Sequence, residues 1–187
     1  MNQAKTLVLP GYANSGPGHW QTRWEALEAS FARVAMPDWD HPVRATWCAT
    51  LDRAVADEPR GPICLAAHSL GCLTVAQWAL RLASSAQLGK IAGALLVAPP
   101  DPAGPAFPRD AHGYDEIALE PLPFPSIVVA SSDDPYGTLA FAERCAMGWG
   151  SRFIDIGPRG HINAESGLGD WEEARRWLAS LVGCIAG

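Results

Sequence analysis

The sequence contains no apolar run long enough to cross a membrane or to act as a secretory signal. Its earliest apolar stretch, Thr6-Leu7-Val8-Leu9, is followed at once by Pro10-Gly11. A signal peptide needs an apolar segment of about 7–15 residues, and a transmembrane helix needs about 20. We therefore expect a cytoplasmic protein without a membrane partner.

Basic residues are scarce and form no stripe. The chain has 14 Lys and Arg against 20 Asp and Glu, which gives a formal net charge of −6. Nucleic-acid-binding proteins gather basic side chains to meet phosphates, so we expect no nucleic-acid partner. Nucleotide motifs are also missing. The turn Gly11-Tyr12-Ala13-Asn14-Ser15-Gly16 is followed by Pro17 where a phosphate-binding loop has Lys, and no Gly-x-Gly-x-x-Gly occurs.

No two cysteines have the Cys-x-x-Cys spacing that is typical of zinc sites and redox centres. The cysteines are five in number and widely separated: Cys48, Cys64, Cys72, Cys145 and Cys184. Most lie in apolar sequence, and we interpret them as buried, reduced thiols. We expect neither a metal nor an organic cofactor.

The chain does contain a regular alternation of short apolar runs and amphipathic stretches. Its 187 residues, of which 48% are apolar and 18% charged, fit one compact domain over residues 1–187. Strands are predicted at 5–9, 33–36, 62–67, 91–97, 126–130 and 152–156, and helices at 19–31, 45–57, 70–83, 137–147 and 170–181. This alternation predicts an α/β fold, an open doubly wound sheet of about six mainly parallel strands with helices on both faces.

One long segment fits neither a strand nor a helix. Residues 99–125 contain eight prolines, which interrupt both kinds of structure. Long irregular segments inside compact domains are often functional. We therefore expect this segment to form a partial lid over a site.

The sequence Ala67-His68-Ser69-Leu70-Gly71 lies between a predicted strand and a predicted helix. Small residues two positions before and after the serine allow a sharp turn that exposes the Ser69 hydroxyl. The usual pattern is Gly-x-Ser-x-Gly, and Ala67 replaces its first glycine. We interpret Ser69 as a candidate nucleophile, although a serine that only caps the following helix would give the same local pattern.

Two later loops carry the partners that a serine nucleophile requires, a base and a group that orients the base. Asp133-Asp134 follows the fifth predicted strand, and His161 follows the sixth. Functional residues of an open parallel sheet gather at the carboxyl ends of its strands. We therefore predict a catalytic triad of Ser69, Asp134 and His161. Asp133 and Asp134 point in alternate directions, so which one faces the histidine stays open.

Attack on a carbonyl group creates an oxyanion, which needs two hydrogen-bond donors. We predict the backbone N–H groups of Leu70 and Tyr12, the second of which lies in the turn after the first strand. His19 and Trp20 begin a helix directly after this turn, and Trp39 lies at a strand end on the same side. We expect His19, Trp20 and Trp39 to bind substrate, although most tryptophans at helical spacing belong to a core.

Several short motifs together resemble a known family. They are Pro10-Gly11, Asn14-Ser15-Gly16-Pro17-Gly18-His19-Trp20-Gln21, Trp24, Pro37-Asp38-Trp39, Pro42, His68-Ser69-Leu70-Gly71, Asp133-Asp134-Pro135 and Gly160-His161. With this combination the chain resembles, over nearly its whole length, the small serine hydrolases of the retinoblastoma-binding-protein-9 and YdeN type. The resemblance implies an α/β-hydrolase fold without a large cap domain and with the same triad.

We therefore expect a serine hydrolase that cleaves a small ester, thioester or amide through an acyl-enzyme on Ser69. Its expected partner is a small acyl substrate, and no feature of the sequence indicates a protein partner. Two alternatives stay open. One is a non-catalytic interaction module that has kept the fold, and the other is an acyltransferase that uses the same triad.

Overall fold

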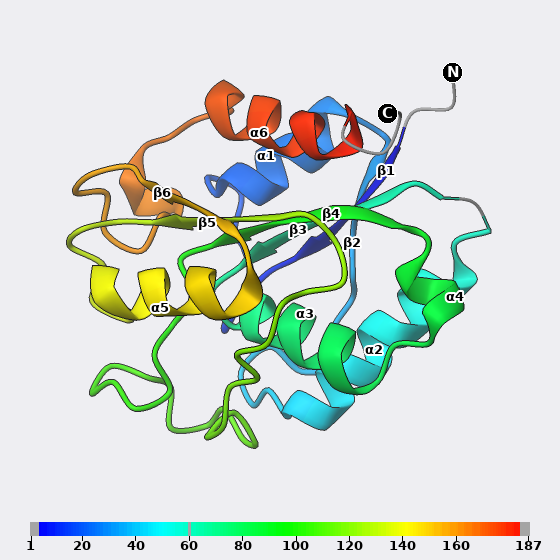
Figure 1. Ribbon diagram of the computed structural model, residues 1–187. Helices are drawn as coiled ribbons and strands as arrows, with labels where there is room; N and C mark the ends of the chain where they lie inside the picture. Colours follow the sequence, from blue (N-terminus) through cyan, green and yellow to red (C-terminus); the bar gives the residue numbers. More distant parts are fainter. Residues whose placement is uncertain (1–3, 60, 184–187) are drawn as a thin grey trace.

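A six-stranded sheet lies at the centre of the computed structural model, which describes residues 4–59 and 61–183 (Figure 1). The strands are β1 (Lys5–Leu9), β2 (Phe31–Arg33), β3 (Ile63–His68), β4 (Ile91–Val97), β5 (Ser126–Ala130) and β6 (Arg152–Asp155). They pair in the order β2-β1-β3-β4-β5-β6, and each of these pairings is parallel. The predicted open parallel sheet is confirmed.

Helices cover both faces of this sheet. They are α1 (Trp20–Leu27), α2 (Arg44–Asp57), α3 (Leu70–Arg81), α4 (Ser85–Leu88), α5 (Leu139–Trp149) and α6 (Glu172–Gly183), with a 3-10 turn at Ala164–Ser166. Helices α1 and α6 lie on one face, and α2, α3 and α5 lie on the other (Figure 1). Each face has its own buried apolar cluster. Within the described part of the chain, no helix combines the length and hydrophobicity that crossing a bilayer requires.

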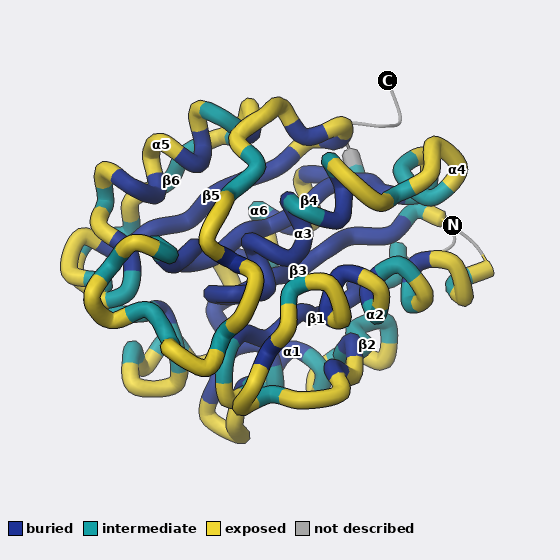
Figure 2. Tube along the Cα trace, turned by 90° about the horizontal axis from the view of Figure 1, so that it is seen from below, coloured by how far each residue is buried: buried dark blue, intermediate teal, exposed yellow. Residues whose placement is uncertain are grey.

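The two central strands explain why helices are needed on both sides. Every residue of β3 and of β4 is buried, as expected for parallel strands covered on both faces. Figure 2 shows this pattern, with buried residues along the middle of the molecule and exposed residues on the outer sides of the helices. The continuous apolar sequences of β3 and β4 therefore specify the centre of the sheet.

The chain departs from the predicted elements near the edge strand β2. Helix α1 ends at Leu27 rather than near residue 31, and β2 begins at Phe31, earlier than the predicted 33–36. Phe31 pairs with Thr6 of β1, and its ring lies 5.8 Å from that of Trp24. Contacts with distant parts of the chain thus set these boundaries. The short helix α4, which begins with a capping box between Ser84 and Gln87, was not predicted.

The proline-rich segment between β4 and β5 is irregular, as predicted. Residues 99–125 form no helix or strand, apart from one isolated bridge between His112 and Val43. The segment is nevertheless packed, because Tyr114 is 1% exposed and its hydroxyl lies 3.1 Å from Thr74 Oγ1 in α3. Its action as a lid stays a prediction.

The cysteines that the structure describes are buried and free: Cys48, Cys64, Cys72 and Cys145. Burial raises the pKa of the Cys64 thiol to about 11 and that of Cys48 and Cys145 to about 12. They therefore stay protonated and unreactive at neutral pH. Cys184 lies outside the described residues.

Candidate active site

Ser69 lies at the turn between strand β3 and helix α3. Its backbone has φ 54° and ψ −125°, a conformation that costs a non-glycine residue on the order of 1–3 kcal/mol. The Ser69 amide donates to the Val97 carbonyl oxygen at 2.9 Å, which ties the turn to the neighbouring strand. A strained turn of this type, after a buried strand and before a helix, presents nucleophilic serines in hydrolases.

Two glycines allow other parts of the chain to pass close to this turn. A Cβ atom on Gly71 would lie 2.4 Å from the Leu9 carbonyl oxygen, and one on Gly11 would lie 2.6 Å from Ser69 Cβ. Both distances are too short for any side chain, so only glycine fits. Ala67 is fully buried, and its methyl group packs into the core. Alanine is therefore accommodated where the usual pattern has glycine.

The side chains of Ser69, His161 and Asp134 form a continuous hydrogen-bonded chain. Ser69 Oγ lies 2.9 Å from His161 Nε2, and His161 Nδ1 lies 2.9 Å from each carboxylate oxygen of Asp134. An ionised carboxylate only accepts hydrogen bonds, so Nδ1 carries the proton and Nε2 accepts from the serine hydroxyl. The Asp134 side chain is 2% exposed and that of His161 11%. This geometry suits transfer of the serine proton to the imidazole.

The two adjacent aspartates have different partners. Asp134 also accepts from the Tyr136 amide at 2.9 Å. Asp133 accepts instead from Ser131 Oγ and from the Gly160 amide, each at 2.7 Å. These hydrogen bonds hold the pKa of the Asp133 carboxyl below its usual value. The structure thus brings Asp134 to the histidine, while Asp133 fixes the loop on which that histidine lies.

The two residues predicted to provide oxyanion donors are Leu70, which follows Ser69 in the chain, and Tyr12, which lines the cavity beside Ser69. Leu70 is the first residue of α3, where a backbone N–H has no acceptor within its own helix. Tyr12 lies in the turn after β1 and lines the same cavity as Ser69. The next amide of that turn, that of Ala13, is already used, because it donates to the Trp39 carbonyl oxygen at 2.9 Å.

A buried glutamine connects this turn to the sheet. Gln21 Nε2 donates to the carbonyl oxygens of Leu9 at 3.1 Å and Ala66 at 2.9 Å, and Gln21 Oε1 accepts from Ser15 Oγ at 2.7 Å. Arg33 adds a hydrogen bond to the Ser15 carbonyl oxygen at 3.0 Å. The turn that carries Tyr12 is therefore fixed by the side chains of Gln21 and Arg33, and no sequence motif indicated this role.

A cavity of about 370 Å³ opens beside Ser69. Its lining contains no Lys, Arg, Asp or Glu and consists of Tyr12, Ala13, Asn14, His19, His68, Ser69, Pro100, Pro108, Tyr136, His161 and Asn163. His19 thus lines the cavity, and its binding of substrate stays a prediction. The proline-rich segment contributes Pro100 and Pro108 to the wall.

The structure does not bring the other two predicted substrate-binding residues, Trp20 and Trp39, to this cavity. Trp20 is 1% exposed, and its Nε1 donates to the Ile162 carbonyl oxygen at 2.9 Å. The Trp39 ring packs instead against that of Trp47, with ring centroids 5.5 Å apart. Trp20 therefore acts from the core, where it holds the loop that carries His161.

Three histidine rings lie close together at the site. The centroid of the His68 ring is 4.6 Å from that of His19 and 4.8 Å from that of His161. Burial and the two neighbouring imidazoles lower the pKa of His68 well below its ordinary value. Burial, with the charges of Arg33 and His161, lowers the pKa of His19 to about 3. His19 and His68 therefore stay neutral near pH 7.

Two residues that hold His161 in place were not predicted. His68 Nε2 donates to the His161 carbonyl oxygen at 2.8 Å, and the Tyr136 ring lies 4.4 Å from the His161 ring, centroid to centroid. His68 precedes Ser69, and Tyr136 follows Asp134-Pro135. Their closeness in sequence to triad residues was the only sign of a role in positioning His161. Within residues 4–59 and 61–183, no three His, Cys, Asp or Glu side chains are grouped to hold a metal ion.

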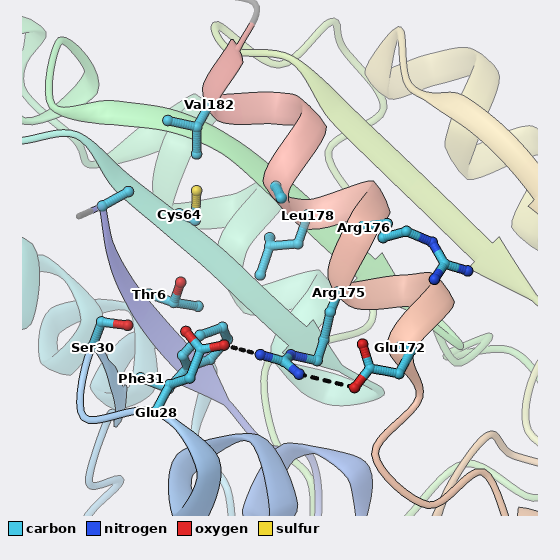
Figure 3. Close-up of a pocket in the computed structure, with 12 residues that line it drawn as sticks. Thr6, Glu28, Ser30, Phe31, Cys64, Glu172, Arg175, Arg176, Leu178 and Val182 are labelled. Atoms are coloured by element: carbon cyan, nitrogen blue, oxygen red, sulfur yellow. Dashed lines mark hydrogen bonds and ion pairs between the residues drawn. The ribbon is translucent and has the colours of Figure 1, made fainter. Parts of the chain in front are cut away.

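A second, larger pocket of about 490 Å³ lies between helix α6 and the first residues of β1, β2 and β3 (Figure 3). Arg175 lines this pocket and pairs with Glu28 and with Glu172. Thr6, Cys64 and Leu178 form part of its wall. Figure 3 shows no serine–histidine pair among the residues drawn there, so this pocket lacks the chemistry found beside Ser69.

Comparison with known proteins places the chain among hydrolases. A family model described as serine hydrolase matches residues 6–180. The chain is 30% identical to a YdeN-like hydrolase from Pectobacterium atrosepticum, with 98% of this chain and 92% of that one covered and a TM-score of 0.84. It is also similar to the ydeN gene product from B. subtilis (18% identity, 97% and 100% covered, TM-score 0.74) and to a thermophilic esterase from Thermogutta terrifontis (18% identity, 96% and 91% covered, TM-score 0.65). These two show a shared fold. No curated protein sequence matches the chain.

Proposed function

The chain belongs to the serine hydrolase family, and we propose that it hydrolyses a small ester, thioester or amide through an acyl-enzyme on Ser69. One observation carries this proposal. Ser69 Oγ, the imidazole of His161 and the Asp134 carboxylate are joined by hydrogen bonds of 2.9 Å beside a cavity. The resemblance to YdeN-type hydrolases inferred from the sequence motifs, and the α/β-hydrolase fold that it implied, are confirmed.

In the first half of the reaction, the Ser69 hydroxyl gives its proton to His161 Nε2 as Oγ attacks the carbonyl carbon. Asp134 stabilises the imidazolium that forms. The carbonyl oxygen becomes an oxyanion, which the amides of Leu70 and Tyr12 bind. Collapse of this intermediate breaks the bond to the leaving group, which takes the proton from His161 and departs.

In the second half, a water molecule gives a proton to His161 Nε2 and attacks the acyl carbon. The second tetrahedral intermediate breaks its bond to Ser69 Oγ, and the proton returns from the imidazole to that oxygen. The products are a carboxylic acid and the original alcohol, thiol or amine. Apart from the substrate and this water, the proposed steps use only Ser69, Asp134, His161 and the amides of Leu70 and Tyr12.

The cavity supports the proposed class of substrate. Its volume of about 370 Å³ is near the lower end of the range for small-molecule sites, roughly 300–1,000 Å³. Its lining carries neutral polar groups, among them the side chains of Asn14 and Asn163, and no Lys, Arg, Asp or Glu. Both properties favour a short, uncharged acyl group over a long apolar chain.

Labelling with a fluorophosphonate probe tests this proposal. We expect the wild-type protein to be labelled, with the adduct on the peptide that contains Ser69, and we expect Ser69→Ala to be unlabelled. If the folded wild type is not labelled, an interaction module that keeps the fold becomes the better account. If an added alcohol yields more ester than water yields acid, the protein is an acyltransferase instead.

A further inference from the structure

His19 carries a buried polar atom that has no partner. Within residues 4–59 and 61–183, one buried side-chain nitrogen or oxygen atom has no hydrogen-bond partner, and that atom is the Nε2 of His19. The residue is 4% exposed and lines the cavity beside Ser69. Native proteins pair nearly all such atoms, so an unpaired one at a site calls for a functional explanation.

The other ring nitrogen shows which form the imidazole takes. His19 caps helix α1, and its Nδ1 accepts a hydrogen bond from the Gln21 amide at 3.2 Å. A nitrogen that accepts has no proton, so in the neutral ring the proton lies on Nε2. Burial and nearby positive charge lower the pKa of His19 to about 3. Nε2 is therefore a neutral hydrogen-bond donor at physiological pH.

The ring is also held in place. It packs edge-on against the His68 ring, with centroids 4.6 Å apart, and lies 5.3 Å from the Trp20 ring. The helix cap fixes its other edge. This donor is fixed, buried and unpaired before substrate enters, so the free-energy cost of removing water from it is already part of folding. An acceptor that reaches Nε2 therefore gains a full hydrogen bond.

We propose that the His19 Nε2–H donates to a neutral oxygen on the acyl part of the substrate, so that the enzyme prefers acyl groups with a hydroxyl, ether or amide oxygen near the scissile carbonyl. This inference rests on the proposed hydrolase function and names its substrate class. The amides of Leu70 and Tyr12 already provide the two donors that the oxyanion needs, which leaves this third donor for another oxygen. A site built around a hydrogen bond rejects analogues that lack the matching group.

Two substitutions separate the donor of His19 from its helix cap. His19→Asn keeps an acceptor close to the position of Nδ1 and so keeps the cap, but it loses the donor at Nε2. His19→Gln can place an N–H near the position of Nε2, but it loses the cap. The probes are two para-nitrophenyl esters of equal chain length, the methoxyacetate, whose acyl chain has an ether oxygen, and the butyrate, which has a methylene there.

The measured quantity is the ratio of kcat/KM for the methoxyacetate to that for the butyrate, since the difference in intrinsic reactivity cancels between variants. We expect this ratio to fall about tenfold or more in His19→Asn and to stay within about threefold of wild type in His19→Gln. An unchanged ratio in His19→Asn overturns the proposal. So does a ratio that falls in His19→Gln alone or equally in both variants, because the effect then follows the cap or a general disturbance.

The same experiment keeps the two proposals apart. If wild type is labelled by the fluorophosphonate and hydrolyses both esters but the ratio does not respond to His19→Asn, this inference fails and the hydrolase function stands. If wild type is neither labelled nor active, the hydrolase function fails, and the inference fails with it. Melting temperatures of the variants confirm that each is folded.

Discussion

Two cavities of the molecule, one beside Ser69 and one beside α6, differ in their chemistry, and the smaller of these two has the features of an active site. The cavity beside Ser69 measures about 370 Å³ and the pocket beneath α6 about 490 Å³. In the larger pocket the charged Arg175 is neutralised by Glu28 and Glu172, and burial raises the pKa of the Cys64 thiol to about 11. The smaller cavity contains a strained serine and an unpaired imidazole donor. Stored strain and unmet hydrogen-bonding capacity distinguish the two better than volume does.

The position of each cavity in the sheet explains this difference. Ser69, Asp134 and His161 follow strands β3, β5 and β6, so the parallel topology brings them together at the carboxyl ends of the strands. The α6 pocket lies near the amino ends, where Thr6 and Cys64 belong to the strands themselves. Loops at the carboxyl ends can vary their side chains freely, whereas strand residues must pack.

The largest expected effect comes from the acid in the smaller cavity. Asp134→Asn removes the carboxylate that accepts from His161 Nδ1. The proton of the neutral ring is then no longer held on Nδ1, so kcat should fall about 10³–10⁴-fold. Asp133→Asn is the matched control, because that carboxylate bonds only to loop atoms, and it should cost less than about tenfold. Ester hydrolysis by the two folded variants checks this. Equal losses would remove the distinction between the aspartates.

A smaller effect should follow when the turn that approaches Ser69 is disturbed. Gly11→Ala would place a Cβ 2.6 Å from Ser69 Cβ and 3.0 Å from Ser69 Oγ, so the hydroxyl must move and kcat/KM should fall about 10–100-fold. Gly16→Ala, in the same turn, meets no atom within 4 Å and serves as the control. If both variants keep full activity, the position of Ser69 does not depend on this contact.

The buried histidine of the smaller cavity should also affect stability as pH changes. The pKa of His19 is near 3 in the folded protein and close to 6.5 when unfolded, so the unfolded state binds the extra proton between these values. Stability is therefore full above about pH 6.5 and declines as pH falls, by about 2 kcal/mol at pH 5. Urea unfolding at pH 7 and at pH 5 measures this change in the free energy of unfolding. In His19→Asn the fall between the two pH values should be smaller than in wild type by about this amount. His41→Asn, at an exposed position, should keep the wild-type decline, and an equal decline in His19→Asn would contradict the account.

The smallest effects are expected in the larger pocket. Arg175→Gln breaks the ion pairs with Glu28 and Glu172, and because the arginine is partly exposed, stability should fall by no more than about 1 kcal/mol. Its kcat/KM for ester hydrolysis should stay within about twofold of wild type. Thermal melting and ester kinetics measure the two quantities. A tenfold loss of activity at unchanged stability would mean that the α6 pocket takes part in catalysis.

The sequence predicted those features that depend on local pattern and chain order. Continuous apolar runs identified β3 and β4, and the positions of Ser69, Asp134 and His161 after the third, fifth and sixth strands placed them at one edge of the sheet. It could not predict where Trp20 points, because contacts with Trp24 and Trp171 decide that. Nor could it reveal the unpaired Nε2 of His19, which depends on every atom around it.

The most direct test is to trap the acyl-enzyme from an ester. We expect rapid acid quenching of the wild type during turnover of para-nitrophenyl acetate, followed by digestion and mass spectrometry, to find the acetyl group on the peptide that contains Ser69. The adduct should be absent in Ser69→Ala and unaffected by Arg175→Gln. An acetyl group found at another residue, or turnover that persists in Ser69→Ala, would contradict the assignment of catalysis to the smaller cavity.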